Sequence, residues 1–118
     1  MNDSIKEITE EIQNFVQDRD WKKFHSPKDM AVAISGEAGE LMQHFIWKGT
    51  GESHEIANRK REQVADEMAD IAILLFEFAG NLDLDLGSEI RAKLKRNQLR
   101  YPISKTKGNN LKYDELAD

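Results

Sequence analysis

Two long segments of the chain repeat their apolar residues at intervals of three and four positions, which is the spacing of one face of an α-helix. In residues 27–47 this face includes Met30 and Leu41, and in residues 54–78 it includes Ile71. No stretch of convincing length alternates apolar and polar residues as a half-buried strand does. The pattern therefore predicts an all-α fold.

Capping residues, glycine and proline mark where the predicted helices begin and end. Four helices are expected, at about residues 4–20, 26–47, 54–78 and 88–100. Ser4 and Ser26 have side chains that cap a helix start, and Pro102 disfavours helix at the residue before it. The polar residues 103–118 are expected to form an irregular tail. The prediction is one domain over residues 1–118, built as a four-helix bundle.

The composition narrows the classes of function. A chain of 118 residues suits one domain with a real core. The 17 basic and 22 acidic residues give a net charge of -5, which argues against a protein that binds nucleic acid polymers. The absence of cysteine excludes disulfides, thiolate catalysis and zinc sites of the cysteine type. No long apolar run is present, so we expect no membrane association and a soluble, cytoplasmic protein.

Two pairs of acids lie inside the apolar stripes. Glu37 and Glu40 are three positions apart in the second predicted helix, and Glu67 and Asp70 repeat the arrangement in the third. Residues three apart are neighbours on a helix surface. If the two helices face each other through their stripes, four carboxylates meet in a partly apolar pocket. Like charges that close must take up protons or bind a cation.

A divalent metal ion is the simplest compensation for such a cluster. All the candidate ligands are hard oxygens and neither pair contains a histidine, so Mg²⁺ or Mn²⁺ fits better than zinc. A di-iron carboxylate site would need a Glu-x-x-His motif, but His44 follows Glu40 by four residues. One such acid pair alone usually lies on a solvated helix face. Two pairs inside apolar stripes favour a metal site suited to phosphate chemistry.

The motif Glu37-x-x-Glu40, followed after 26 residues by Glu67-x-x-Asp70, resembles the signature of the all-α MazG-like nucleoside triphosphate pyrophosphohydrolases. Within that family the chain looks most like the branch that contains dCTP pyrophosphatases. Three further motifs resemble that branch in order and position: WKKFHSP at 21–27, FIWK at 45–48 and KLKRNQLRYP at 93–102. The resemblance extends over about residues 5–113.

The resemblance implies Mg²⁺-dependent hydrolysis of a nucleoside or deoxynucleoside triphosphate between the α and β phosphates, giving the monophosphate and pyrophosphate. It implies a house-cleaning role in the nucleotide pool, of the dNTP or dCTP type, with Mn²⁺ as a substitute metal. The four acids of the motif would hold the metal, and either Glu37 or Glu40 would act as general base. Leu74 is a departure, because dCTP-preferring relatives carry an aromatic residue there, so strict preference for dCTP is not implied.

Aromatic residues flank the second predicted helix. The flat rings of Trp21 and Trp47 suit stacking on a nucleobase, typically worth about 1 to 3 kcal/mol per base. The resemblance also makes them base-pocket residues, and the alternative is that they are core aromatics. His25, just ahead of the Ser26 cap, either contacts the base or sugar or secures the loop. Lys48 is a weaker candidate for substrate contact.

The fourth predicted helix is basic in a chain that is acidic as a whole. Lys93, Asn97 and Arg100 fall on one stripe of this helix. The resemblance favours these residues, together with Tyr101, as phosphate or sugar contacts. The alternative is that cations near a helix C-terminus are favoured by the macrodipole without any ligand.

Apolar residues also lie off the main stripes of the two central helices, among them Val32, Met42, Ile73 and Phe76. A helix that is apolar on most sides needs cover on most sides. Four helices of one chain supply too little cover, so we expect a homo-oligomer, either a dimer or a tetramer built from dimers.

A second function class stays open from the residues alone. The chain would then be a non-catalytic oligomeric helical bundle whose buried acids hold a structural cation or pair with lysines. A non-hydrolysable triphosphate should stabilise the enzyme beyond the effect of Mg²⁺, whereas a structural cation site needs no nucleotide.

Overall fold

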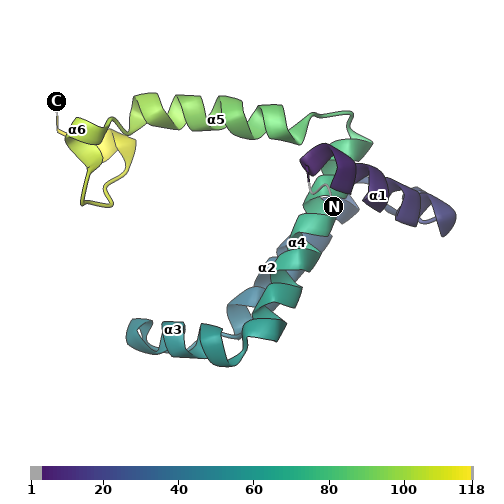
Figure 1. Cartoon of the computed structure of the whole chain (residues 1–118), viewed down its shortest axis with the longest axis horizontal. Coiled ribbons are helices and arrows are strands. Elements are labelled where there is room, and N and C mark those ends of the chain that lie inside the picture. The colour runs from purple at the N-terminus through teal and green to yellow at the C-terminus, as the bar shows by residue number, and fades with distance from the viewer. Residues whose placement is uncertain (1–3, 118) are drawn as a thin grey trace. The chain divides into compact units, whose positions relative to one another are not determined.

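The structure, a computed structural model, describes residues 4–117, and every regular element in them is helical (Figure 1). The elements are α1 (Ile5–Asp18), η1 (Lys22–Phe24), α2 (Pro27–Gln43), α3 (Thr50–Arg59), α4 (Arg61–Asn81), α5 (Leu86–Arg100), α6 (Ile103–Thr106) and η2 (Tyr113–Glu115). The predicted all-α class is confirmed. The chain divides into two compact units, Met1–Leu84 and Asp85–Asp118, each of which is described by itself.

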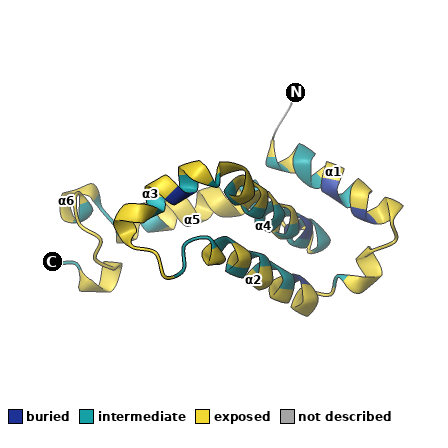
Figure 2. Cartoon of the chain, turned by 90° about the horizontal axis from the view of Figure 1, so that it is seen from below, coloured by how far each residue is buried: buried dark blue, intermediate teal, exposed yellow. Residues whose placement is uncertain are grey.

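The central element of the first unit is α4, which packs against α2, α1 and α3 (Figure 2). Met30 on α2 is 1% exposed, and Ile56 on α3 is also buried. The remaining buried apolar side chains of the described residues are Ile12, Val16 and Ala79. Val32 and Met42, which the sequence placed off the main stripe of α2, are exposed. The inner stripe of α2 therefore packs inward as its apolar spacing predicted.

The serine caps form as the sequence predicted. The Ser4 hydroxyl accepts a hydrogen bond from the Glu7 backbone N–H, and the Ser26 hydroxyl accepts one from the Asp29 N–H, both at 3.2 Å. Pro27 occupies the first position of α2, where the missing N–H costs nothing. These contacts fix the start of α1 and α2.

The end of the second helix was predicted too late. α2 stops at Gln43, and the chain then turns through residues 44–47. Trp47 has a φ of 64°, a left-handed value that a right-handed helix cannot contain. The prediction of helix to Trp47 was therefore wrong by one turn.

The third predicted helix is two helices. α3 and α4 are separated at Lys60, whose φ of −102° and ψ of 30° leave the helical region. No glycine or proline marks this position, so the local signals for a break were missing. α3 also begins at Thr50, ahead of the predicted start at about residue 54.

The second unit begins with α5, whose start is capped by the Asp85 side chain accepting from the Ser88 N–H at 3.0 Å. α5 therefore starts two residues before Ser88 and ends ahead of Pro102, as predicted. The tail is not irregular throughout, because it contains α6 and η2. The Tyr101 and Tyr113 rings meet edge to face with centroids 6.3 Å apart, which ties η2 to the end of α5.

The predicted count of four helices was wrong, since the described residues contain six α-helices and two 3₁₀ turns. A four-helix bundle and a single domain over residues 1–118 remain predictions. None of the helices in residues 4–117 combines the length and hydrophobicity that a membrane crossing requires.

Candidate metal and nucleotide site

Three of the four predicted metal ligands meet where α2 packs on α4. Glu37 from α2 and Glu67 and Asp70 from α4 each offer one carboxylate oxygen, and these oxygens all lie within 4.8 Å of one another. The i, i+3 spacing on α4 and the inward stripe of α2 produce this arrangement. We refer to Glu37, Glu67 and Asp70 as the acid cluster.

Two oxygens of the acid cluster are buried without a partner. Oε2 of Glu37 and Oε2 of Glu67 have no hydrogen bond to any group in the described part of the chain. A buried acceptor left unpaired typically costs about 1 to 3 kcal/mol, and more when it is charged. The fold keeps both, which is the pattern expected of oxygens that receive a cation.

The fourth acid, Glu40, stands next to the acid cluster. Burial is the main reason that the pKa of Glu37 is raised, followed by a hydrogen bond and repulsion from Glu40, then by repulsion from Asp70 and Glu67. The pKa of Glu67 is raised by burial first and by the same contact with Glu40 next. Glu40, itself an exposed residue, therefore lies near a carboxyl group of each helix. All four acids of the predicted motif therefore lie close together where α2 packs on α4.

His44 also reaches this place, one turn of helix after Glu40. Its Nε2 lies 3.9 Å from Oε1 of Glu67, and its charge partly opposes the rise in the pKa of Glu67. The sequence analysis considered His44 only as a ligand of a di-iron site and did not include it among the site residues. It is not part of the group whose ligand atoms lie within 4.8 Å.

The acid cluster fits a divalent cation. Its donors are carboxylate oxygens, the ligands that hard cations prefer, and two of its carboxylates each have a buried oxygen without a hydrogen-bond partner among the described residues. The carboxylates come from two helices, so a cation between them would also offset the repulsion across the α2 and α4 contact.

The two tryptophans lie outside the buried core. Trp21 precedes η1 and is 43% exposed, with its ring edge to face against Phe15 at a centroid distance of 5.7 Å. Trp47 is 95% exposed and follows the end of α2. In the single chain, neither ring is the core aromatic that was the alternative to a base-stacking role. Lys48, beside Trp47, is exposed as well.

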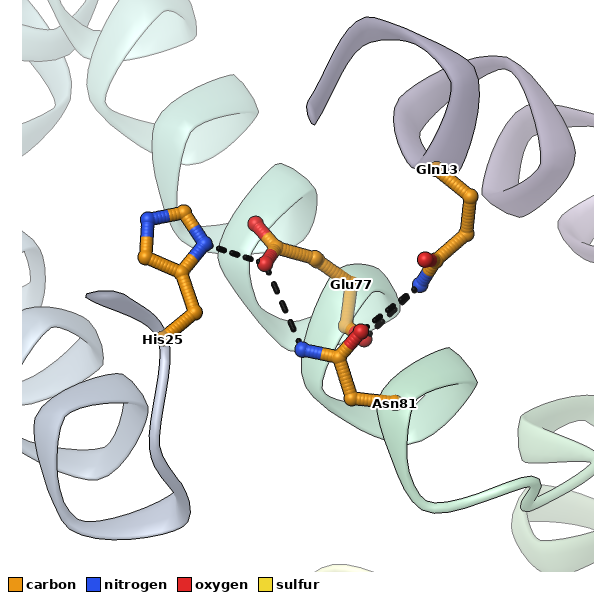
Figure 3. A network of polar contacts seen from close by, with 4 residues as sticks. All are labelled: Gln13, His25, Glu77 and Asn81. Atoms are coloured by element: carbon orange, nitrogen blue, oxygen red, sulfur yellow. Dashed lines mark hydrogen bonds and ion pairs between the residues drawn. The ribbon is translucent and has the colours of Figure 1, made fainter. Parts of the chain in front are cut away.

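His25 is held by a buried acid that the sequence analysis missed. Its Nδ1 lies 2.5 Å from Oε2 of Glu77, a residue of α4 that is 2% exposed (Figure 3). The Asn81 amide donates to the same oxygen at 3.3 Å, and the Gln13 amide donates to the Glu77 backbone carbonyl at 3.2 Å. A signal was present, because Glu77 interrupts the most apolar stretch of the chain, residues 71–79.

The other predicted substrate residues, Lys93, Asn97, Arg100 and Tyr101, belong to the second unit. Lys93 is exposed and Asn97 is partly covered. The Arg100 guanidinium lies over the ring of Tyr113, 4.7 Å from its centroid. No carboxylate in residues 4–117 forms an ion pair with Lys93 or Arg100, so both charges are available to an anion.

Comparisons with known proteins agree on one class of enzyme. A model of the MazG-like family matches residues 32–116. The chain is 34% identical over 115 residues to dCTP pyrophosphatase 1 of Bos taurus and 33% identical to that of Homo sapiens. Each match covers 96% of this chain and 68% of the relative. A crystal structure of a pyrophosphatase from Archaeoglobus fulgidus superposes with a TM-score of 0.80 and 29% identity, covering 86% of this chain and 95% of that one.

Proposed function

This chain belongs to the MazG-like family, and from that premise we propose that it is a nucleoside triphosphate pyrophosphohydrolase. The reaction is hydrolysis between the α and β phosphates, which yields a nucleoside monophosphate and pyrophosphate. The substrates are deoxynucleoside triphosphates of the dCTP type, and the role is house-cleaning of the cytoplasmic nucleotide pool. The relatives named dCTP pyrophosphatase 1 support this substrate class.

The observation that carries the proposal is the pair of unpartnered buried oxygens in the acid cluster. We propose that Glu37, Glu67 and Asp70 hold Mg²⁺, for which Mn²⁺ can substitute. When bound, such an ion neutralises phosphate charge and lowers the pKa of a coordinated water.

Glu40 lies outside the acid cluster, and we propose a role for it other than metal binding. It belongs to the predicted metal motif, but it lies outside the group of three whose oxygens come within 4.8 Å. It still faces both Glu37 and Glu67. We therefore assign Glu40 as the general base that takes the proton of the attacking water.

Two further groups of residues are proposed to bind the nucleotide. Trp21 and Trp47 stack on the base, which their exposed rings support, and His25 completes the base pocket. The basic stripe of α5 contacts phosphate, and the residues assigned to this role are Lys93, Asn97, Arg100 and Tyr101, with Lys48 from the segment between α2 and α3.

The exposed apolar residues support a homo-oligomer, either a dimer or a tetramer. Val32, Met42, Met68 and Ile73 on the two central helices are all exposed in the single chain. A second copy of α2 and α4 would cover them. Light scattering after size-exclusion chromatography measures the mass, and a monomer at micromolar concentration would refute this part of the proposal.

Pyrophosphate release from a panel of canonical and base-modified triphosphates, with Mg²⁺ present, tests the activity. We expect the deoxynucleotides of cytosine to be among the best substrates.

Glu40→Gln should lower kcat by about a hundredfold or more while Mn²⁺ binding persists. Glu37→Gln should instead weaken Mn²⁺ binding. A wild-type protein that binds Mn²⁺ but releases no pyrophosphate from any triphosphate would be the non-catalytic bundle with a structural cation.

A further inference from the structure

Glu77 is a buried acid that the metal chemistry does not use. It lies on the same face of α4 as Asp70, seven residues further on, which places it about 10 Å along the helix axis. It is not part of the acid cluster. Among the described residues its side chain contacts only His25 and Asn81 by hydrogen bond or ion pair.

The contacts define which group donates. Oε2 of Glu77 accepts a hydrogen bond from the Asn81 amide. Because this oxygen acts as an acceptor, the His25 nitrogen that contacts it, Nδ1, carries the proton. Nε2 then lies on the side of the ring away from Glu77 (Figure 3). The orientation of the imidazole is thus set by a carboxylate on another element, α4.

His25 is the anchor of the loop that carries Trp21. Between these two residues runs η1, in which the Phe24 N–H donates to the Trp21 carbonyl at 2.9 Å and the His25 N–H to the Lys22 carbonyl at 3.0 Å. The side chains of residues 21–24 are all exposed. Trp21 is held to α1 by its N–H bond to the Val16 carbonyl at 3.1 Å and by its edge contact with Phe15, and the bond from His25 to Glu77 ties the other end of this turn to α4, the helix that carries Glu67 and Asp70.

Gln13 and Gly80 pack closely around the backbone of Glu77. The Gln13 amide donates to the Glu77 carbonyl and to Oδ1 of Asn81, both at 3.2 Å. This approach needs Gly80, because a Cβ at that position would lie 2.5 Å from Nε2 of Gln13. The network therefore ties α1, the loop before α2 and α4 at one point.

We propose that Glu77 is a positioning residue for nucleobase recognition: its carboxylate orients His25 and fixes the loop of Trp21 on the helix that carries Glu67 and Asp70. Glu77 itself does not touch the nucleotide. The proposal rests on the pyrophosphohydrolase function, in which Trp21 and His25 form part of the base pocket.

Steady-state kinetics with dCTP test the role. Glu77→Ala should raise KM by about tenfold while kcat stays within about twofold, since the acid cluster is intact. Glu77→Gln should give a smaller rise, because its amide oxygen still accepts from Nδ1–H. Asp66→Asn, an exposed acid on the same helix, is the matched control and should leave KM unchanged. A fall in kcat at constant KM would show mere loss of folded enzyme and overturn the proposal.

A double-mutant cycle asks whether Glu77 acts through His25. His25→Ala and His25→Ala/Glu77→Ala should have the same KM, because removing Glu77 has no further effect once the imidazole is gone. Multiplicative effects of the two changes would overturn the assignment. Glu77→Gln replaces Glu77→Ala in the cycle if the alanine variant does not fold.

Fluorescence separates this proposal from the enzymatic one. In a Trp47→Phe background, Trp21 is the remaining tryptophan. Acrylamide should quench it more strongly, by about twofold, after Glu77→Ala or His25→Ala, because the loop is released. This result needs no turnover, so it holds even if the wild type releases no pyrophosphate. Quenching that is unchanged by both substitutions would refute the tether.

Discussion

Glu37 on α2 and Glu67 on α4 bring carboxylate oxygens within 4.8 Å of each other, and Oε2 of each is buried without a hydrogen-bond partner among the described residues. The two helices that form the main contact of the first unit are thus joined at a point where their charges repel. Stability, metal binding and activity should all respond to changes at this point.

Glu37→Gln should stabilise the metal-free protein at neutral pH. The fold raises the pKa of Glu37 above its ordinary 4.5, chiefly through burial, so the native state holds the proton more tightly than the unfolded chain does. The contribution of this group is fully present below pH 4.5 and is lost as the pH rises through the raised pKa. The advantage of the glutamine variant should therefore be absent at low pH and grow above 4.5.

Urea unfolding with EDTA at a series of pH values measures that difference. Glu10→Gln, which removes an exposed acid from α1, controls for net charge. Addition of Mn²⁺ at pH 7 should reverse the order, because the wild type then gains stability by binding and the variant gains less. A glutamine variant that is equally favoured at every pH would contradict the burial of this charge.

Trp47→Gly should separate stability from substrate binding. A bulky residue at a φ of 64° is strained, and glycine adopts this conformation freely, so the free energy of unfolding should rise by about 1 kcal/mol. KM should rise at the same time if Trp47 stacks on the base as proposed, because the substitution removes its ring. Trp21→Gly is the comparison: Trp21 has an ordinary φ of −93° and packs on Phe15, so glycine there should lower the free energy of unfolding, with a rise in KM as well if Trp21 also stacks on the base. Equal losses of stability at both positions would argue against strain at Trp47.

Lys93→Gln should raise KM for the triphosphate by about tenfold, if the basic stripe of α5 contacts phosphate. Lys95→Gln removes the same charge from the opposite face of α5 and should have little effect. The pair keeps net charge and helix propensity matched. Similar changes in KM at both lysines would indicate a general electrostatic attraction rather than a defined contact.

Met30→Ala should cost about 2 to 5 kcal/mol, because Met30 is 1% exposed between α2 and its neighbours. Met42→Ala, on the same helix but 52% exposed, should change stability by less than about 0.5 kcal/mol in the monomer. Denaturant unfolding at several protein concentrations measures both. A cost at Met42 that matches Met30 at every protein concentration would contradict its exposure in the single chain, whereas a cost that grows with protein concentration would show that another copy covers it.

The features that could be predicted from the sequence depend on neighbours along the chain. Ser4 and Ser26 cap the helices they precede, and the i, i+3 acid pairs meet because helix periodicity fixes which face they occupy. The break at Lys60 could not be predicted, since it carries no glycine or proline signal. The bond from His25 to Glu77 joins residues 52 positions apart, and only the packed structure brings them together.

Gly80 limits how this sequence can change among homologues. A methyl group there would meet the Gln13 amide at 2.5 Å and the Thr9 methyl at 3.1 Å, so a larger residue at position 80 would displace the Gln13 amide from its bond to the Glu77 carbonyl. A smaller residue at 13 would make room but would also remove the donor that secures the Glu77 carbonyl. Positions 13, 77, 80 and 81 should therefore vary together, as one inherited unit rather than as four independent sites.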